Sequence, residues 1–148
     1  MKQIVKQYRL IGTATDWDET RLQNSQESYN AALQLFDPST LSLFESFHVI
    51  YLTTGNHVKG YMKIADGSLN AVVVDVRRII IGALESLSTA IVVAHNHPSG
   101  DIKPSLQDRQ LTQKLQDACN LFGIQLQDHL ILGNGDYYSF REQGNIIN

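Results

Sequence analysis

Two histidines one residue apart are the side chains of this sequence best placed to do chemistry. His95 and His97 follow the apolar run Ala90-Ile91-Val92-Val93-Ala94. In an extended segment, residues i and i+2 project to the same face, so both imidazoles can converge on one point. Asp108 follows at the expected start of the next helix and can add a carboxylate. Two histidines and one carboxylate, with a position left for water, are typical of a catalytic zinc site rather than a closed structural one.

The same residues also fit a purely structural interpretation. Ser105-Leu106-Gln107-Asp108 matches a capping box, in which Ser105 caps the helix and Asp108 returns to a main-chain N–H. A His-x-His pair after a strand also occurs in ordinary polar turns. Because the first turn of a helix tolerates a carboxylate well, Asp108 can serve both purposes. The agreement of pattern, spacing and position at the end of a strand favours the metal site.

Such a set of groups would suffice for amide hydrolysis. Zinc lowers the pKa of its bound water to about 7 and polarises a carbonyl group. A nearby carboxylate that does not bind the metal can take the proton from the water and pass it to the leaving amine. A hydroxyl such as that of Ser105, which is expected to point into the same cleft, can donate to the developing oxyanion.

Alternating helices and strands are predicted to position these groups. Helices around a mixed sheet imply a layered α/β domain, and ligands of such sheets gather beyond the carboxyl ends of the strands, where His95 and His97 stand. The apolar periodicity predicts strands over residues 47–52, 58–64, 71–74, 89–94, 124–132 and 137–140, helices over about 25–36, 76–87 and 105–122, and a short helix after Asp37-Pro38.

Composition narrows the class of protein. The 148 residues fit one domain, and the 43% hydrophobic and 18% charged fractions are those of an ordinary globular protein. The net charge of −3, without a basic stripe, argues against strong nucleic-acid binding by this chain. Cys119 is the single cysteine, which excludes an internal disulfide and a CxxC zinc site. Without a signal-peptide core or an apolar run of about 18 residues, no membrane association is expected, and we expect a cytoplasmic protein.

At this point the chain resembles a known family. His95-x-His97, seven residues, then Ser105-x-x-Asp108 matches H-x-H-x7-S-x-x-D, the metal motif of the JAMM/MPN metalloproteases. Ala94-His95-Asn96-His97-Pro98-Ser99-Gly100 and Gln127-Asp128-His129-Leu130-Ile131 are similar to its RadC branch. The resemblance implies a three-layer α/β/α fold with a mixed sheet, similar to cytidine deaminases, over residues 24–148. Residues 1–23 would then be an N-terminal extension, with at most one strand. The resemblance also implies a Zn²⁺ ion held by His95, His97 and Asp108.

The family also uses an upstream glutamate as a base, just before a core strand. Glu45 occupies that place before residues 47–52; the alternative is a solvated residue at a helix end. Two features depart from the family. Asn96 stands where the eukaryotic isopeptidases carry Ser or Thr, although Asn is usual in the RadC branch. Residues 1–23 are too few for the helix-hairpin-helix region of longer RadC proteins, so the part that suggests DNA contact is not expected.

Two functions from different classes follow. The first is a zinc-dependent hydrolase of peptide or isopeptide bonds, with a protein or peptide substrate. The second is a binding module, with DNA-processing or recruitment duties, that keeps a metal site without turnover. Glu45 favours the enzyme, because a binding module needs no base.

On the strand over 124–132, we expect only one of Asp128 and His129 to face inward. His129 could support a metal ligand or be a satisfied buried histidine. Asp101 is a rival carboxylate in a turn.

Overall fold

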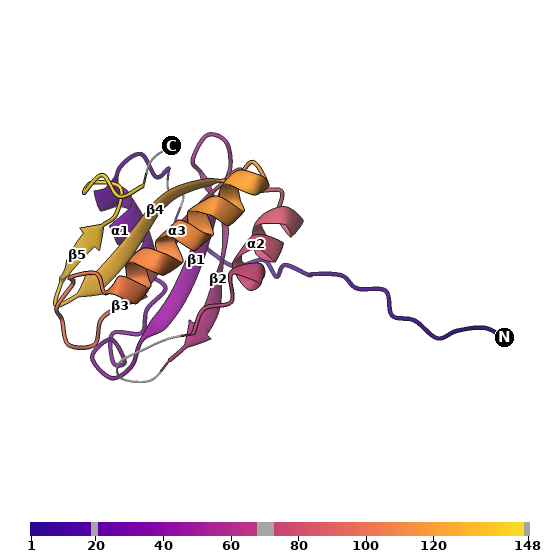
Figure 1. Ribbon diagram of the computed structural model, residues 1–148, viewed down its shortest axis with the longest axis horizontal. Helices are drawn as coiled ribbons and strands as arrows, with labels where there is room; N and C mark the ends of the chain where they lie inside the picture. Colours follow the sequence, from indigo (N-terminus) through magenta and orange to yellow (C-terminus); the bar gives the residue numbers. More distant parts are fainter. Residues whose placement is uncertain (19–20, 68–72, 147–148) are drawn as a thin grey trace.

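The computed structural model describes residues 1–18, 21–67 and 73–146. A five-stranded mixed sheet, in the order β2-β1-β3-β4-β5, lies between α1 on one face and α2 and α3 on the other (Figure 1). This confirms the predicted three-layer α/β/α architecture. The elements are α1 (Ser25–Leu33), β1 (Ser46–Leu52), β2 (Val58–Asp66), α2 (Val76–Glu85), β3 (Ala90–Asn96), α3 (Leu106–Leu121), β4 (Gln125–Gly133) and β5 (Asp136–Ser139).

The strand order places β3 at the centre of the sheet. β1 pairs antiparallel with β2 and with β3, β3 pairs parallel with β4, and β4 pairs antiparallel with β5. A parallel pair needs a long crossover connection, which α3 supplies between β3 and β4. The crossover therefore begins where β3 ends, so His95 and His97 at the end of this strand are brought together with the first turn of α3.

Both faces of the sheet are interior. On β3, Ile91 and Val93 pack against the apolar stripes of α2 and α3, whereas Val92 and Ala94 pack on the side of α1. The same alternation places His95 on the α3 face and Asn96 on the α1 face of the strand. Every residue of β1 and β3 is buried, as a central strand covered on both sides requires.

The two covered faces correct one prediction. Asp128 and His129 on β4 are both buried, although only one of them was expected to face inward. The Asp128 carboxylate lies on the α1 face and accepts hydrogen bonds from the hydroxyls of Ser25 (3.0 Å) and Ser139 (2.6 Å). His129 lies on the α3 face. Because helices cover both faces, neighbouring residues of this strand both have an interior to enter.

Two predicted elements differ in the structure. The segment after Pro38 forms turns instead of a short helix, because the Asp37 carboxylate accepts the amide of Ser39 at 2.9 Å and so closes a local turn. Of the strand predicted over 71–74, residues 71 and 72 lie outside the described residues. Val73 and Val74 do not form a strand: Val74 packs on the core beside the cap of α2, and Val73 is 90% exposed.

The N-terminus extends away from the body of the molecule (Figure 1), and residues 1–18 form no strand. Its alternating residues Ile4 and Tyr8 are exposed, so the weak alternation buries nothing. The chain meets the domain at Trp17, whose ring lies 5.2 Å from that of Tyr61 between centroids, and then at Leu22, which is fully buried and donates its amide to the Asn56 carbonyl at 2.9 Å. Among the described residues, every helix is too short or too polar to cross a bilayer.

Candidate metal centre

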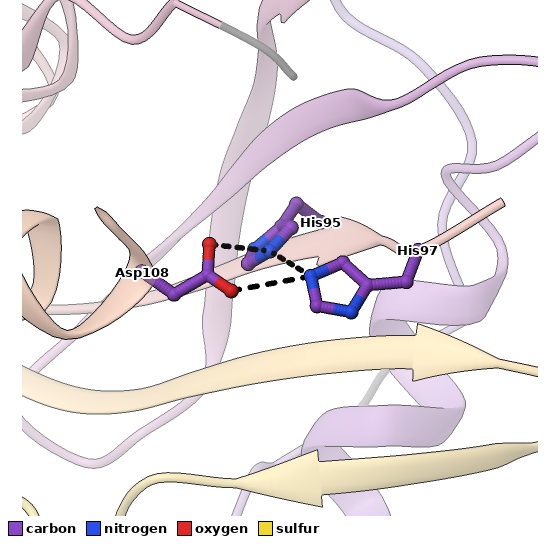
Figure 2. A group of neighbouring side chains, drawn as sticks. All are labelled: His95, His97 and Asp108. Atoms are coloured by element: carbon purple, nitrogen blue, oxygen red, sulfur yellow. Dashed lines mark hydrogen bonds and ion pairs between the residues drawn. The ribbon is translucent and has the colours of Figure 1, made fainter. Parts of the chain in front are cut away.

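His95, His97 and Asp108 converge at the carboxyl end of β3. The Nε2 atoms of the two histidines lie 3.2 Å apart. His95 Nε2 lies 3.2 Å from Asp108 Oδ1, and His97 Nε2 lies 3.2 Å from Asp108 Oδ2 (Figure 2). Each of the three side chains offers one possible ligand atom to a metal, and these three atoms all lie within 4.8 Å of one another. The three side chains expected to form a metal site are therefore neighbours that point at one another.

His97 is held by the backbone on two sides. Its amide donates to the Leu132 carbonyl on β4 at 2.9 Å, and its Nδ1 lies 2.7 Å from the Asp101 carbonyl, to which it can only donate. The loop that carries Asp101 turns at Gly100, whose φ of 84° favours glycine, and packs directly on Gly133. With Nδ1 engaged as a donor, a neutral His97 presents a bare Nε2 to Asp108.

Asp108 forms the predicted capping box and faces the histidines at the same time. Its Oδ2 accepts the Ser105 amide at 2.8 Å, while its own amide donates to Ser105 Oγ at 3.0 Å. The carboxylate bridges the cap and the imidazoles, so the two interpretations of this segment are compatible. Ser105 Oγ accepts in the cap, and among the described residues its own proton is not used in a hydrogen bond. That proton can be donated to a ligand.

The charges at this centre favour an ionised carboxylate beside the imidazoles. Burial alone would raise the pKa of Asp108, but hydrogen bonds from His95 and His97 hold it well below its ordinary value. Burial alone would lower the pKa of His97, but its hydrogen bonds to Asp108 and to the Asp101 carbonyl, together with the charges of Asp108 and Glu45, raise it. A proton on His97 Nε2 would occupy the space that a cation would take, so the two are expected to compete.

The donor set fits a divalent cation. Two imidazole nitrogens and a carboxylate oxygen are ligands that Zn²⁺ prefers. In a tetrahedral site with ligands at about 2.1 Å, neighbouring ligand atoms lie about 3.4 Å apart, close to the 3.2 Å contacts among these residues. The side chains of His97 and Asp108 keep 14% of their surface exposed, so the centre can be reached from solvent.

Glu45 lies beside this centre, in the residue before β1. It is 9% exposed, and burial raises its pKa although the charges of His95 and His97 oppose this. In the antiparallel register Phe47 is opposite His95. Continued by two residues past the paired strands, this register brings Glu45 to the position opposite His97. The role of Glu45 as the base stays a prediction. Asp101, the rival carboxylate, instead accepts the amide of Lys103 at 3.0 Å.

The segment that carries Glu45 is fixed by Asn96, a role not recognised from the sequence. Asn96 Oδ1 accepts the Ser46 amide at 2.8 Å. Its Nδ2 donates to the carbonyls of Leu41 (2.8 Å) and Phe44 (2.9 Å). The residue between the two histidines thus links the candidate ligands to the candidate base. Its position between the histidines was the available signal, because alternation sends it to the opposite face of β3.

His129 is the buried partner of His95, and Thr112 is the partner of His129. His95 Nδ1 lies 2.9 Å from His129 Nε2, and His129 Nδ1 lies 2.7 Å from Thr112 Oγ1. The sequence suggests His129 as a support for a ligand, but it does not single out Thr112. Thr112 stands four residues after Asp108 and hence on the same side of α3, a spacing that could have indicated it.

Known proteins are similar to this chain in sequence. Among curated proteins, a UPF0758 protein of Streptococcus suis is 41% identical over 103 residues, covering 70% of this chain and 42% of the relative. A UPF0758 protein of Aquifex aeolicus is 37% identical over 123 residues, covering 83% and 52%. One from Streptococcus gordonii is 40% identical over 137 residues, covering 93% and 59%. The chain spans about half the length of these relatives. The sequence profile of the RadC-like JAB domain matches residues 22–145. This chain therefore belongs to the RadC-like JAB domain family.

Proposed function

We propose that this protein is a zinc-dependent hydrolase that cleaves a peptide or isopeptide bond. The observation that carries the proposal is the convergence of His95, His97 and Asp108 on one solvent-accessible point, with Glu45 beside it. The family includes metallohydrolases, but the names of the relatives state no activity. The proposal therefore rests on the arrangement of the side chains.

Each group around the centre would have a separate role in the reaction. A zinc ion bound there would lower the pKa of a water to about 7 and polarise the substrate carbonyl. Glu45 would take the proton of the attacking water and hand it to the leaving amine, a role that its raised pKa favours. The Ser105 hydroxyl, which keeps its own proton while it caps α3, would donate to the oxyanion that develops on the carbonyl.

The same proposal covers substrate and location. We propose a protein or peptide substrate, since an amide bond is what a water nucleophile, a base and an oxyanion donor together cleave. Because the net charge is −3, we propose that this chain does not bind nucleic acid strongly. A cytoplasmic location is proposed from the composition, in which Cys119 is the single cysteine and is buried.

A metal analysis followed by an activity assay tests the proposal. The chain, purified without a His tag, should carry one zinc per molecule and hydrolyse members of a panel of peptides and isopeptide-linked conjugates. His95→Ala and His97→Ala should lose both metal and turnover. Glu85→Ala, at the exposed end of α2, is the matched control and should keep both. Metal without turnover on any substrate would favour the binding module. Stoichiometric metal in the His95/His97 double variant would remove the site assignment.

A further inference from the structure

A line of three hydrogen bonds connects the backbone of Asp108 to the ring of His95. The Thr112 hydroxyl donates to the Asp108 carbonyl at 2.7 Å. Thr112 Oγ1 also lies 2.7 Å from His129 Nδ1, and His129 Nε2 lies 2.9 Å from His95 Nδ1. The line therefore starts and ends at residues of the candidate metal centre, and it passes through Thr112 and His129, which are not among the candidate ligands.

The chemistry of the atoms fixes the direction of each bond. A carbonyl oxygen only accepts, so the hydroxyl of Thr112 uses its single proton on Asp108. Thr112 Oγ1 must then accept from His129, which therefore carries a hydrogen on Nδ1. A neutral imidazole with its hydrogen on Nδ1 has a bare Nε2, and this atom can only accept from His95 Nδ1. In a neutral His95 this leaves Nε2, the atom that faces His97 and Asp108, without a hydrogen, so a metal can bind there in place of a proton shared with Asp108.

The surroundings of His129 keep its ring neutral and in place. His129 is 0% exposed, so a charge on its ring would be cut off from water, which is unfavourable without a compensating partner. The ring of Phe140 stacks on it at 4.7 Å between centroids, and Phe47 packs against its edge at 5.7 Å. The doubly protonated form, in which both ring nitrogens donate, is thereby disfavoured.

We propose that Thr112 and His129 are positioning residues that hold His95 in the tautomer whose bare Nε2 faces the metal. Thr112 stands one turn after Asp108 on α3, so the helix that supplies one ligand also orients another. The proposed effect on metal affinity rests on the proposed function, whereas the tautomers themselves do not require a metal. Partners of this kind fix the ring orientation of metal-binding histidines and raise their basicity.

Two-bond ¹⁵N–¹H correlation spectra of the full metal-free chain test the tautomers directly. At a pH above neutrality, the wild type should show His129 as the neutral form with its hydrogen on Nδ1. Thr112→Ser keeps the hydroxyl and should give the same pattern. Thr112→Val has a similar shape but no hydroxyl, and it should shift His129 toward the other tautomer. A hydrogen on Nε2 of His129 in the wild type would overturn the inference, whatever the protein does with metal.

Competition with a zinc chelator tests the consequence. Thr112→Val should bind zinc roughly 10–100-fold more weakly than the wild type, whereas Thr112→Ser should stay within a few-fold of it. Far-ultraviolet circular dichroism and thermal unfolding of the metal-free variants establish that the fold is kept. Equal affinities for the valine variant and the wild type would overturn the inference while leaving the hydrolase proposal intact. A wild type that binds no zinc would count against the proposed function, and the tautomer spectra would still decide the inference.

Discussion

Asn96 accepts a hydrogen bond from the backbone amide of Ser46 at 2.8 Å, across 50 residues of sequence. With its two donated bonds to the carbonyls of Leu41 and Phe44, the side chain uses its oxygen and both amide hydrogens on the segment that carries Glu45. Because its neighbours are His95 and His97, one tripeptide sets the position of the candidate ligands relative to the candidate base. An amide is required here, since only an amide both accepts and donates in this way.

Replacing Asn96 by Asp should therefore destabilise the protein without a change in shape. The carboxylate cannot donate to Leu41 and Phe44, so two partly buried carbonyls lose their partners, which should cost about 1–3 kcal/mol in the free energy of unfolding. Urea unfolding measures this loss. Asn120→Asp, on an exposed position of α3, is the matched control and should stay within about 0.5 kcal/mol of the wild type. Equal losses in both variants would contradict the structural role assigned to Asn96.

Glu45→Gln should separate metal binding from catalysis. The amide keeps the size of the side chain but cannot take a proton, so any hydrolysis should fall by roughly 10²–10⁴-fold while zinc content and thermal stability persist. The comparison variant is Glu85→Gln, a carboxylate exposed at the end of α2, which should retain wild-type rates. A Glu45→Gln variant with unchanged turnover would mean that another group is the base.

His97 and Asp108 should make the stability of the metal-free protein depend on pH in both directions. The folded pKa of Asp108 lies below its unfolded value of 3.8, so its contribution is present above 3.8 and is lost as the pH falls through the folded value. The folded pKa of His97 lies above its unfolded value of 6.5, so its contribution is complete below 6.5 and is lost as the pH rises through the folded value.

Thermal unfolding of the metal-free chain across pH checks this reasoning. Tm should decline as the pH rises from 6.5 through the folded pKa of His97, and His97→Gln should reduce the decline. His57→Gln, at an exposed histidine outside the centre, should leave it unchanged. Zinc should act in the opposite sense, stabilising more at higher pH because it binds the neutral imidazole. An identical slope for the wild type and His97→Gln would refute the assignment.

Gly133→Ala should disturb the metal centre from outside it. A Cβ at Gly133 would lie 2.9 Å from the Gly100 carbonyl oxygen and 3.1 Å from two further backbone atoms of Gly100. Backbone cannot rotate away as a side chain can, so the loop from His97 to Asp101 must move. We expect a loss of about 1–3 kcal/mol in stability and weaker zinc binding, both measured beside Gly60→Ala. Gly60, on β2, has no atom within 4 Å of the added Cβ and should tolerate it.

The parts of the site that the sequence predicted are those that local geometry determines. Strand alternation sends His95 and His97 to one side, and the start of the crossover helix brings Asp108 to them. The contacts of Asn96 and His129 join residues 50 and 34 positions apart, and periodicity carries no information about such pairs. The error on Asp128 and His129 has a related cause, because a single strand does not reveal that helices cover both of its faces.

Duplex DNA should bind this chain only weakly. Each phosphate neutralised by Lys or Arg contributes a salt-dependent term to affinity, and the 12 basic residues are outnumbered by 15 acidic ones. Arg77 and Arg78 are the nearest approach to a cluster, and the Arg77 guanidinium is already paired with Asp75 at 2.9 Å. We expect a Kd in the nonspecific range of about 10⁻⁴–10⁻⁶ M at physiological salt, measured by fluorescence anisotropy with a labelled duplex. Submicromolar binding with a steep salt dependence, reduced in Arg77→Ala/Arg78→Ala, would favour the binding module over the hydrolase.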